Sequence, residues 1–224
     1  MEHIVKILEK EIVTHDVKRF VIEKPEGYSF EPGQVTLISI NKPGWEKKKR
    51  AFTFESLPED LVLEFLIKEY PERKGVTSEL HKLEPGDELI LGNVFGVMRY
   101  HDEGVFIAGG AGITPFLSML KKLHKEGKLG NNKLFFSNKK QEDIILEKEL
   151  KDMFKEHPDN LVFTLTREEK EGYESGRINK EFLQKHLDNF NQNFYIVGPP
   201  PFISDIKEAL ASLGANTQEI VLES

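Results

Sequence analysis

The sequence predicts two domains, an antiparallel β-barrel over residues 1–100 and an α/β domain with a doubly wound, parallel five-stranded sheet over residues 101–224. Three observations predict this organisation. Short β-like runs separated by proline and glycine turns fill the first hundred positions. Strand and helix patterns then alternate, which is typical of parallel sheets with crossover helices. A polar stretch at 101–103 separates the β-rich half from the half with alternating strands and helices. A length of 224 residues suits two domains of about 100 residues each.

The barrel is expected from six runs of β-like composition. Proline–glycine pairs at 32–33, 43–44 and 85–86 supply the fixed or positive φ angles that hairpin corners need. A closed or nearly closed sheet would remove the exposed strand edges. Only the segment 76–83 has a helical pattern in this half. The expected strands are 4–7, 18–22, 35–40, 51–54, 61–67 and 88–91.

The α/β half is expected to begin with the apolar strand 105–108, and four more strands follow it with helices between them. The last helix shows the spacing most clearly, because an apolar stripe recurs every three or four residues and Gly214 can end it. The residues of that stripe are Ile203, Ile206, Leu210 and Leu213. The other expected strands are 134–137, 161–166, 194–197 and 219–222.

Composition excludes several classes of function. The net charge of −7 and the pI near 5.6 argue against a nucleic-acid-coating protein, which would carry a basic surface. The absence of cysteine excludes disulfides, thiolate zinc sites and an iron–sulfur cluster on cysteine ligands. The seven histidines show no metal-ligand spacing, so we expect no metal site.

The sequence also lacks hydrophobic targeting signals. It contains no run of about 18 apolar residues, and its first residues lack the apolar core of a signal peptide. We therefore expect no membrane contact and a cytoplasmic location. The expected oligomeric state is a monomer or weak dimer.

The strongest local signal is a glycine-rich turn directly after the first strand of the α/β half. Gly110 and Gly112 permit close approach of a ligand to the backbone. Thr114 can cap the next helix, and Pro115 fits its first turn. Free N–H groups at the helix start favour binding of a pyrophosphate. The spacing is not G-x-G-x-x-G, and tight strand-to-helix geometry is the alternative reading.

A second turn, at Gly198 and Pro199, follows the fourth strand of the same sheet and opens another helix. Both turns therefore lie at the carboxyl ends of parallel strands, where open α/β sheets bind their ligands. Taken alone, the prolines of this turn could instead serve only to stiffen a loop and start a helix.

Two motifs in the barrel half are suited to binding an anionic ligand. The expected strand from Arg50 to Thr53 carries a permanent cation, the Phe52 ring and a hydroxyl. The expected helix begins near Gly75, which creates a second helix N-terminus. Each motif is weak alone, because Arg50 also ends a run of basic residues that is typical of a solvated loop.

Together, in this order and at these separations, the four motifs resemble those of the ferredoxin–NADP reductase superfamily across nearly the whole chain. The family's R-x-Y-S/T and G-x-x-S elements bind flavin and match residues 50–53 and 75–78. The resemblance implies that Arg50 holds the flavin pyrophosphate and that Thr53 hydrogen-bonds near flavin N5. It implies that the glycine turn binds a nicotinamide nucleotide, with Gly198 beneath the nicotinamide.

The sequence departs from the family pattern at three positions. Phe52 replaces the usual tyrosine, so ring stacking is retained without the phenol hydroxyl. Val197 replaces a cysteine beside the nicotinamide, which makes slower hydride transfer an expectation. Glu223 supplies the acid of the family's C-terminal tail, but the chain ends before its aromatic residue.

The resemblance implies FAD rather than FMN as cofactor, and NADP or NAD as substrate with a slight preference for NADP. The preference comes from three basic residues in segments that meet the adenosine phosphates of NADP-using relatives. The predicted catalytic residues are Thr53 and Glu223. The predicted cofactor-binding residues are Arg50, Ala51, Phe52, Thr53, Ile67, Lys68, Gly75, Val76, Thr77, Ser78, Gly110, Gly112, Thr114, Pro115, Ser137, Asn138, Lys139, Arg167, Arg177, Gly198 and Pro199.

The expected activity is hydride transfer from NAD(P)H to bound FAD, followed by electron transfer to a separate acceptor. Without cysteines the chain cannot hold its own cysteine-ligated cluster, so a flavodoxin, a ferredoxin or an oxygenase component is the expected partner. The basic loop 47–50 is the expected docking site for an acidic acceptor. Two alternatives stay open: reduction of free flavin, and a non-catalytic flavin-binding subunit of an electron-transfer complex.

Overall fold

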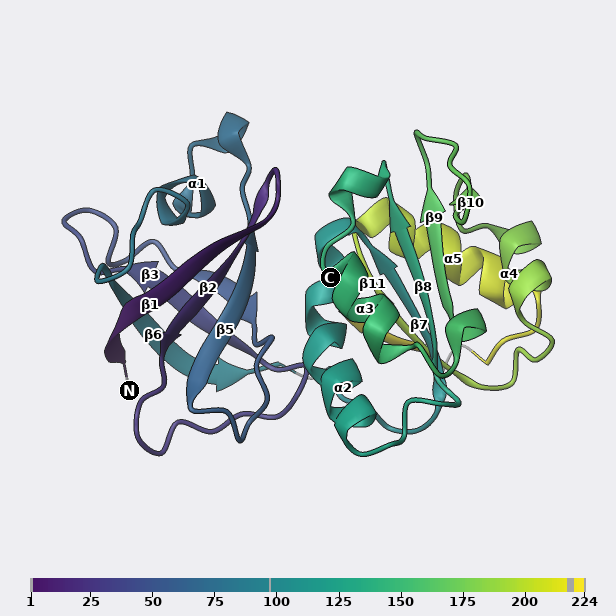
Figure 1. Ribbon diagram of the computed structural model, residues 1–224, viewed down its shortest axis with the longest axis horizontal. Coiled ribbons are helices and arrows are strands. Elements are labelled where there is room, and N and C mark those ends of the chain that lie inside the picture. Colours follow the sequence, from purple (N-terminus) through teal and green to yellow (C-terminus); the bar gives the residue numbers. More distant parts are fainter. Residues whose placement is uncertain (1, 97, 217–219, 224) are drawn as a thin grey trace. The chain divides into compact units, whose positions relative to one another are not determined.

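The computed structural model describes residues 2–96, 98–216 and 220–223, the last four as backbone. The chain forms two compact units (Figure 1). The first comprises Met1–Arg99 and Thr114–Lys122, and the second comprises Tyr100–Ile113 and Leu123–Ser224. The first unit is therefore not one continuous stretch, because part of a helix from the second half of the chain belongs to it.

A six-stranded antiparallel sheet forms the first unit, and all six predicted strands are confirmed. Its order is β4-β3-β6-β1-β2-β5, so β4 and β5 are the edges. The sheet curls into a barrel-like shape, and just past β4 the Glu55 N–H donates to the Glu64 oxygen of β5 at 2.8 Å. The strands are β1 (His3–Thr14), β2 (Val17–Glu23), β3 (Val35–Ile40), β4 (Arg50–Thr53), β5 (Val62–Lys68) and β6 (Glu88–Phe95).

Alternation along these strands fills the barrel. Leu63, Phe65 and Ile67 are buried at every second position of β5, and Phe20 and Ile22 are buried on its neighbour β2. These side chains share one apolar core inside the first unit. Period-two burial along the strands therefore gives the barrel-like sheet one face that packs into its own core.

Helical structure in the first unit is shorter than expected. The predicted helix 76–83 is only α1 (Val76–Leu80), preceded by the 3-10 turn η1 (Pro71–Arg73). After Leu80 the hydrogen bonds span three residues, as the Leu83 N–H donates to the Leu80 oxygen at 3.0 Å. Leu83 is buried all the same, so the apolar pattern that predicted helix reflects core packing of a tighter turn.

The second unit contains a parallel sheet of order β10-β9-β8-β7-β11-β12. All five predicted strands are present, and β10 adds a two-residue edge strand too short to show any alternation. The strands are β7 (Gly104–Gly109), β8 (Lys133–Asn138), β9 (Leu161–Leu165), β10 (Glu174–Ser175), β11 (Asn193–Val197) and β12 (Ile220–Glu223).

Helices cover both faces of this sheet, which makes it doubly wound. Val105 and Ile107 of β7 share a core with Leu183 and Ile206 from the helices α4 and α5, and Figure 1 shows α3 on the face opposite to α5. The helical segments are η2 (Gly110–Ile113), α2 (Thr114–Lys125), η3 (Gln141–Asp143), α3 (Glu147–Met153), η4 (Pro158–Asn160), α4 (Lys180–His186) and α5 (Pro200–Ser212).

The strand order of the second unit reverses between β7 and β11. From β7 the chain proceeds outward through β8 and β9, then returns to β11 on the other side of β7. Such a reversal opens a crevice outside the carboxyl ends of the strands, and ligands of doubly wound sheets bind there. Both predicted glycine turns follow these two central strands.

Candidate functional site

The edge strand β4 carries the predicted flavin-binding residues. Arg50 and Ala51 are exposed, Phe52 is half-buried against the barrel core, and Thr53 is buried opposite Val35. The Arg50 guanidinium donates to the Lys49 carbonyl at 2.8 Å and meets no carboxylate among the described residues. A permanent cation without an acid partner is suited to an anionic ligand.

The α1 N-terminus lies in the same unit and leaves its N–H groups uncapped by side chains. Gly75 is the N-cap, with an extended backbone, and no side-chain cap is formed. Val76 and Ser78 are buried and Thr77 is half-buried. The Ser78 hydroxyl donates to the Tyr70 carbonyl at 3.1 Å and so fixes the preceding loop. The backbone, rather than Ser78, is left to bind phosphate here.

Two of the predicted flavin residues have side chains that are already engaged. Ile67 is 1% exposed in the barrel core, and its carbonyl lies 2.7 Å from Nε2 of the buried His81. The Lys68 ammonium lies 2.6 Å from the Asp16 carboxylate. His81 is the C-cap of α1, so its contact with Ile67 holds the end of this helix against β5. Burial lowers the pKa of His81. The Ile67 side chain is therefore part of the core and the Lys68 ammonium has an acid partner, and no pattern in the sequence indicated the contact between His81 and Ile67.

The first glycine turn has backbone geometry that only small residues tolerate. Gly110 has a φ of 55°. A Cβ on Gly112 would lie 2.9 Å from the Val197 oxygen and 3.0 Å from Gly198. We expected Thr114 to cap the following helix, but the 3-10 turn η2 intervenes and Thr114 is the first residue of α2, with Pro115 second.

The second glycine turn packs directly against the first. A Cβ on Gly198 would lie 2.6 Å from the Phe202 ring, and one on Gly109 would lie 3.3 Å from the same ring. Pro199 is the N-cap of α5 and forms no side-chain cap. The two turns thus meet at the carboxyl ends of β7 and β11, where a ligand would meet main-chain atoms rather than side chains.

Ser137 and Asn138 end the neighbouring strand β8. Asn138 is 5% exposed, yet neither its amide nitrogen nor its amide oxygen has a hydrogen-bond partner in the described structure. A buried, unsatisfied amide is costly in the free protein. Asn138 is therefore complementary to a ligand with both donor and acceptor groups, which fits the ribose and phosphate portions of a nucleotide.

The three basic residues predicted to bind adenosine phosphates lie at the ends of β8 and β9 or close by. The Arg167 N–H donates to the Lys139 carbonyl at 2.8 Å, so these two exposed residues are neighbours. Arg177 lines a pocket of about 210 Å³. The other residues around this pocket are Ser137, Thr166, Ile178, Pro201, Phe202 and Asp205.

Asp205 in this pocket was not predicted. Its carboxylate lies 3.7 Å from the Arg177 guanidinium, and both side chains are largely exposed. The only signal in the sequence was its place three residues after Phe202 in the helix that opens at the second glycine turn. Asp205 partly neutralises one of the three cations.

Glu223, a predicted catalytic residue, is the last residue of β12 and pairs in register with Val197 of β11. Its side chain lies outside the described part of the chain.

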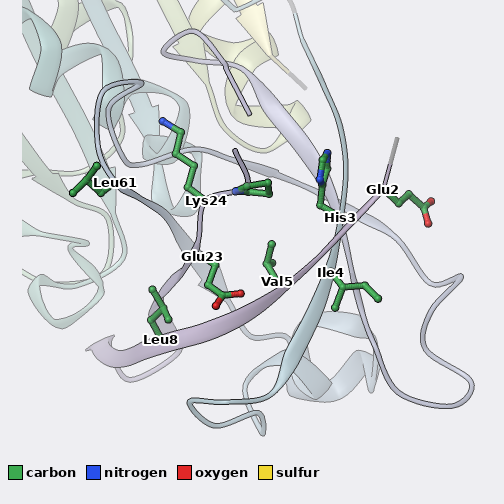
Figure 2. Close-up of a pocket in the computed structure, with 9 residues that line it drawn as sticks. Glu2, His3, Ile4, Val5, Leu8, Glu23, Lys24 and Leu61 are labelled. Carbon is green, nitrogen blue, oxygen red and sulfur yellow. The ribbon is translucent and has the colours of Figure 1, made fainter. Parts of the chain in front are cut away.

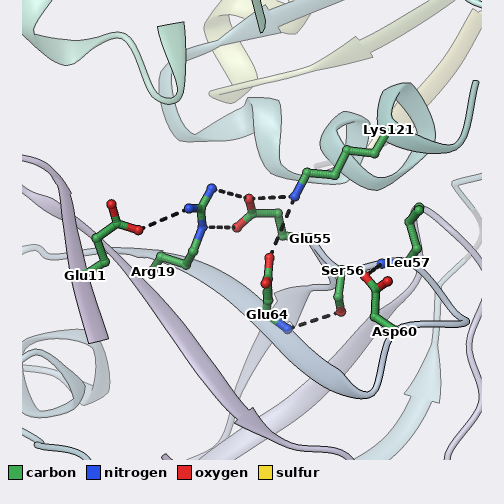
Figure 3. Close-up of polar contacts among 8 residues, drawn as sticks. All are labelled: Glu11, Arg19, Glu55, Ser56, Leu57, Asp60, Glu64 and Lys121. Carbon is green, nitrogen blue, oxygen red and sulfur yellow. Dashed lines mark hydrogen bonds and ion pairs between the residues drawn. The ribbon is translucent and has the colours of Figure 1, made fainter. Parts of the chain in front are cut away.

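A buried charge network in the first unit was also missed (Figure 3). The Glu55 carboxylate is 1% exposed and lies 2.8 Å from the Arg19 guanidinium and 2.9 Å from the Lys121 ammonium. Lys121 also lies 3.8 Å from Glu64. Burial and the Glu55 charge raise the pKa of Glu64. No local pattern could reveal this network, because its members are far apart in sequence.

A larger and more open pocket, of about 750 Å³, lies beside β1 and β2 (Figure 2). Its lining includes the exposed apolar side chains Ile4, Leu8 and Leu61. The ammonium of Lys24, one of its charged lining residues, already donates to the Pro58 carbonyl at 2.5 Å. None of the predicted cofactor residues lines it.

Comparisons with known proteins agree with this geometry. The family model for the oxidoreductase NAD-binding domain matches residues 106–208. NADH-cytochrome b5 reductase 2-A of Vanderwaltozyma polyspora is 31% identical over 212 residues, which cover 87% of this chain and 70% of that protein. NADH-cytochrome b5 reductase 2 of Homo sapiens is 28% identical over 234 residues, covering 88% and 85% of the two chains.

A solved structure shares the whole fold. The FAD/NAD-binding domain of a nitric oxide dioxygenase from Vibrio cholerae superposes with a TM-score of 0.88 at 19% identity, covering 100% of this chain and 98% of that one. The predicted two-domain fold is thereby confirmed. The Arg50 cation, the uncapped α1 start and the unpartnered Asn138 fit FAD and a nicotinamide nucleotide. The chain belongs to the ferredoxin-reductase-like flavoprotein oxidoreductases, the FAD-containing enzymes that oxidise NADH or NADPH and include the NADH-cytochrome b5 reductases.

Proposed function

We propose that the domain of residues 101–224 binds NADH, that the domain of residues 1–100 holds FAD, and that the electrons pass to a haem protein of the cytochrome b5 class. The observation that carries the nucleotide site is the contact between the two glycine turns at the ends of β7 and β11. The names of the sequence relatives support both the donor and the acceptor.

The chain's own residues hold the two redox partners in place. When bound, FAD accepts a hydride from the reduced nicotinamide and gives up the electrons singly to a one-electron acceptor. Arg50 binds the flavin pyrophosphate, and Thr53 donates a hydrogen bond near the flavin ring. The turns at Gly112 and Gly198 give the nucleotide close access to the backbone. Glu223 is proposed to provide a carboxylate at the flavin.

The donor nucleotide is chosen at the pocket around Arg177. The Asp205 carboxylate at 3.7 Å reduces the net positive charge that a 2′-phosphate would meet, and this supports NADH. A specific observation favours NADPH as a second candidate: Lys139 and Arg167 are adjacent, exposed and without acid partners among the residues described. The basic residues led to a slight sequence-based preference for NADP, whereas Asp205 and the relatives' names lead us to propose NADH.

An acidic acceptor requires a basic docking surface on this acidic chain. In the loop before β4, Lys49 is paired with Glu2 and the Lys48 ammonium lies 3.9 Å from the Trp45 ring centroid. Lys47 is exposed and has no acid partner in the described part of the chain. We propose Lys47 and Lys48 as docking residues, and flavodoxin or ferredoxin, the acceptors expected from sequence, are the competing partners.

The test is an anaerobic absorption experiment on the purified, FAD-loaded protein. NADH or NADPH is added first, and a cytochrome b5, a flavodoxin or a ferredoxin is then added to the reduced protein. We expect NADH to bleach the flavin bands faster than NADPH, and the cytochrome to restore them fastest. Preference for flavodoxin or ferredoxin would refute the proposed acceptor while leaving the reductase activity intact.

Two other outcomes correspond to the alternative functions. Weak flavin retention with rapid reduction of added flavin would indicate a free-flavin reductase. Tight flavin that neither nucleotide reduces would indicate a non-catalytic electron-transfer subunit. Replacement of Lys47 and Lys48 by glutamate should slow cytochrome reduction at low salt without slowing flavin reduction, and an unchanged rate would refute the docking surface.

A further inference from the structure

Glu55 is an unusual residue for its position. It follows the flavin strand β4 by two residues, and its carboxylate is almost completely buried, with 1% of the side chain exposed. A buried carboxylate is strongly unfavourable unless cations and hydrogen bonds compensate it. Two cations provide that compensation (Figure 3).

Arg19 contacts both oxygens of the Glu55 carboxylate, and Lys121 contacts one of them. The Arg19 Nη2 and Nε atoms lie 2.8 Å and 3.3 Å from the two Glu55 oxygens, and the Lys121 Nζ lies 2.9 Å from Oε1. A two-pronged guanidinium contact fixes the carboxylate in one orientation. Lys121 bonds the same oxygen, Oε1, that accepts from Arg19 Nη2, so the two cations share one oxygen of the oriented carboxylate.

Lys121 connects this carboxylate to the helix that begins after the first glycine turn. It lies on α2, whose residues Thr114–Lys122 belong to the first unit. Ser118, one turn earlier on the same helix face, is fully buried and accepts a hydrogen bond from the Gly33 N–H at 3.2 Å. The first half of α2 is therefore bound to the barrel at two successive turns.

An apolar pair could pack α2 against the barrel without fixing its rotation or axial position. A buried ion pair adds little stability over such packing, but it admits a narrow range of geometries. Helix α2 begins with Thr114 and Pro115, two residues of the proposed nucleotide site. Strand β4, which ends two residues before Glu55, has Thr53 of the proposed flavin site as its last residue.

We propose that Glu55 is a positioning residue that fixes α2 in one register on the barrel, so that Thr114 and Pro115 keep a fixed position relative to Thr53. This inference rests on the proposed function, because hydride transfer requires close alignment of the two bound rings. Glu55 touches neither cofactor in this proposal. It acts through Lys121.

The experiment compares Glu55→Gln with Glu11→Gln in the FAD-loaded protein. Glu11 is the matched control, because its carboxylate also binds Arg19, at 3.1 Å, but from the exposed side. Stopped-flow reduction by NADH separates the limiting rate of flavin reduction from the apparent Kd of the nucleotide. Hydrogen–deuterium exchange of the segment 114–122, without nucleotide or FAD, reports the attachment of α2 independently of activity.

For Glu55→Gln we expect normal FAD content, normal reduction by dithionite, a limiting rate lower by about tenfold or more, and faster exchange in 114–122. Glu11→Gln should match the unmodified protein in every measurement. Lys121→Met should reproduce Glu55→Gln, and it carries the test if Glu55→Gln does not fold. The double variant should be no slower than either single variant, since both remove one attachment.

Three outcomes would overturn the inference. An unchanged limiting rate in Glu55→Gln and Lys121→Met would do so, even with faster exchange, because the network would then only stabilise the fold. Unchanged exchange in 114–122 would show that the network does not hold α2. If the unmodified protein is not reduced by NADH or NADPH, the proposed function fails, and positioning for hydride transfer fails with it; the exchange result still shows whether Glu55 attaches α2.

Discussion

The two ends of strand β8 carry buried asparagines in opposite situations. Asn132, just before the strand, is fully buried, accepts from the Gly104 N–H at 3.1 Å and donates to the Lys128 carbonyl at 3.0 Å. Asn138, the last residue of the strand, is also buried, yet its amide has no partner among the described residues. The asparagine at the start of β8 is satisfied within the protein, whereas the one at its carboxyl end is left for a ligand.

The same contrast separates two arginines of the barrel. Arg19 is 15% exposed and lies between the carboxylates of Glu55 and Glu11. Arg50 is exposed and, within the described part of the chain, bonds only the Lys49 carbonyl. Asn132 and Arg19 have partners that hold the fold together, whereas we expect Asn138 and Arg50 to find theirs in a bound ligand. Four substitutions test this distinction.

The largest effect is expected for Asn132→Leu. The change leaves the buried Gly104 N–H without its partner and removes the partner of the part-buried Lys128 carbonyl, so at roughly 1–3 kcal/mol for the buried group the protein should lose about 2 kcal/mol of stability. Urea unfolding measures this loss. Asn131→Leu is the control, because Asn131 is exposed and should change stability by less than about 0.5 kcal/mol. Equal effects at the two positions would contradict the comparison.

Arg50→Gln should weaken FAD binding by about tenfold to a hundredfold, because it removes charge-assisted hydrogen bonds worth roughly 1.5–3 kcal/mol. Titration of the flavin-free protein with FAD, followed by flavin fluorescence, measures the Kd. Lys47→Gln removes an exposed charge from the same loop and should leave the Kd unchanged. A normal Kd in Arg50→Gln would remove this residue from the flavin site.

Asn138→Leu should have two smaller effects of opposite sign. Removing an unsatisfied buried amide should raise the stability of the nucleotide-free protein by up to about 1 kcal/mol, while nucleotide binding weakens about fivefold. Urea unfolding and calorimetric titration with NAD⁺ measure the two quantities. A loss of stability would mean that the amide is satisfied in the folded protein, as Asn132 is.

The smallest effect concerns the pH dependence of stability at Glu64. Burial and the Glu55 charge raise the pKa of Glu64 above its usual 4.5, so the folded state binds a proton more tightly than the unfolded state. Ionisation of Glu64 therefore lowers the free energy of unfolding. This free energy falls as the pH rises from 4.5 through the pKa of Glu64 in the folded state. Glu64→Gln should flatten thermal unfolding midpoints across this range, and Glu11→Gln should not.

The strands and turns of this fold could be predicted because they depend on local patterns. The β-like run 61–67 between turn signals predicted β5, and Gly214, with a φ of 83°, follows the last helix, where it was expected to end the apolar stripe. The glycine turns were recognised for a similar reason. Gly112 has almost no room for a side chain, and a position as crowded as this requires glycine, which is visible in the sequence.

The features that escaped prediction depend on residues distant in sequence. Glu55 meets Arg19 across 36 positions and Lys121 across 66 positions, and an isolated acidic residue after a strand gives no sign of either partner. The missing partners of Asn138 are likewise visible only in three dimensions. The burial of Ile67 and the pairing of Lys68 with Asp16 are also tertiary features, and the predicted contacts of these two residues with a cofactor stay predictions.

The division of helix α2 limits how this protein can be taken apart. A cut between Arg99 and Tyr100 looks natural, but the first fragment would lack Ser118 and Lys121 of its own unit. Glu55 would keep Arg19 and lose its second cation. Recombination between relatives at that point would join barrels to helices that did not evolve with them. A viable exchange should move α2 together with the barrel, even though the two are separate in the gene.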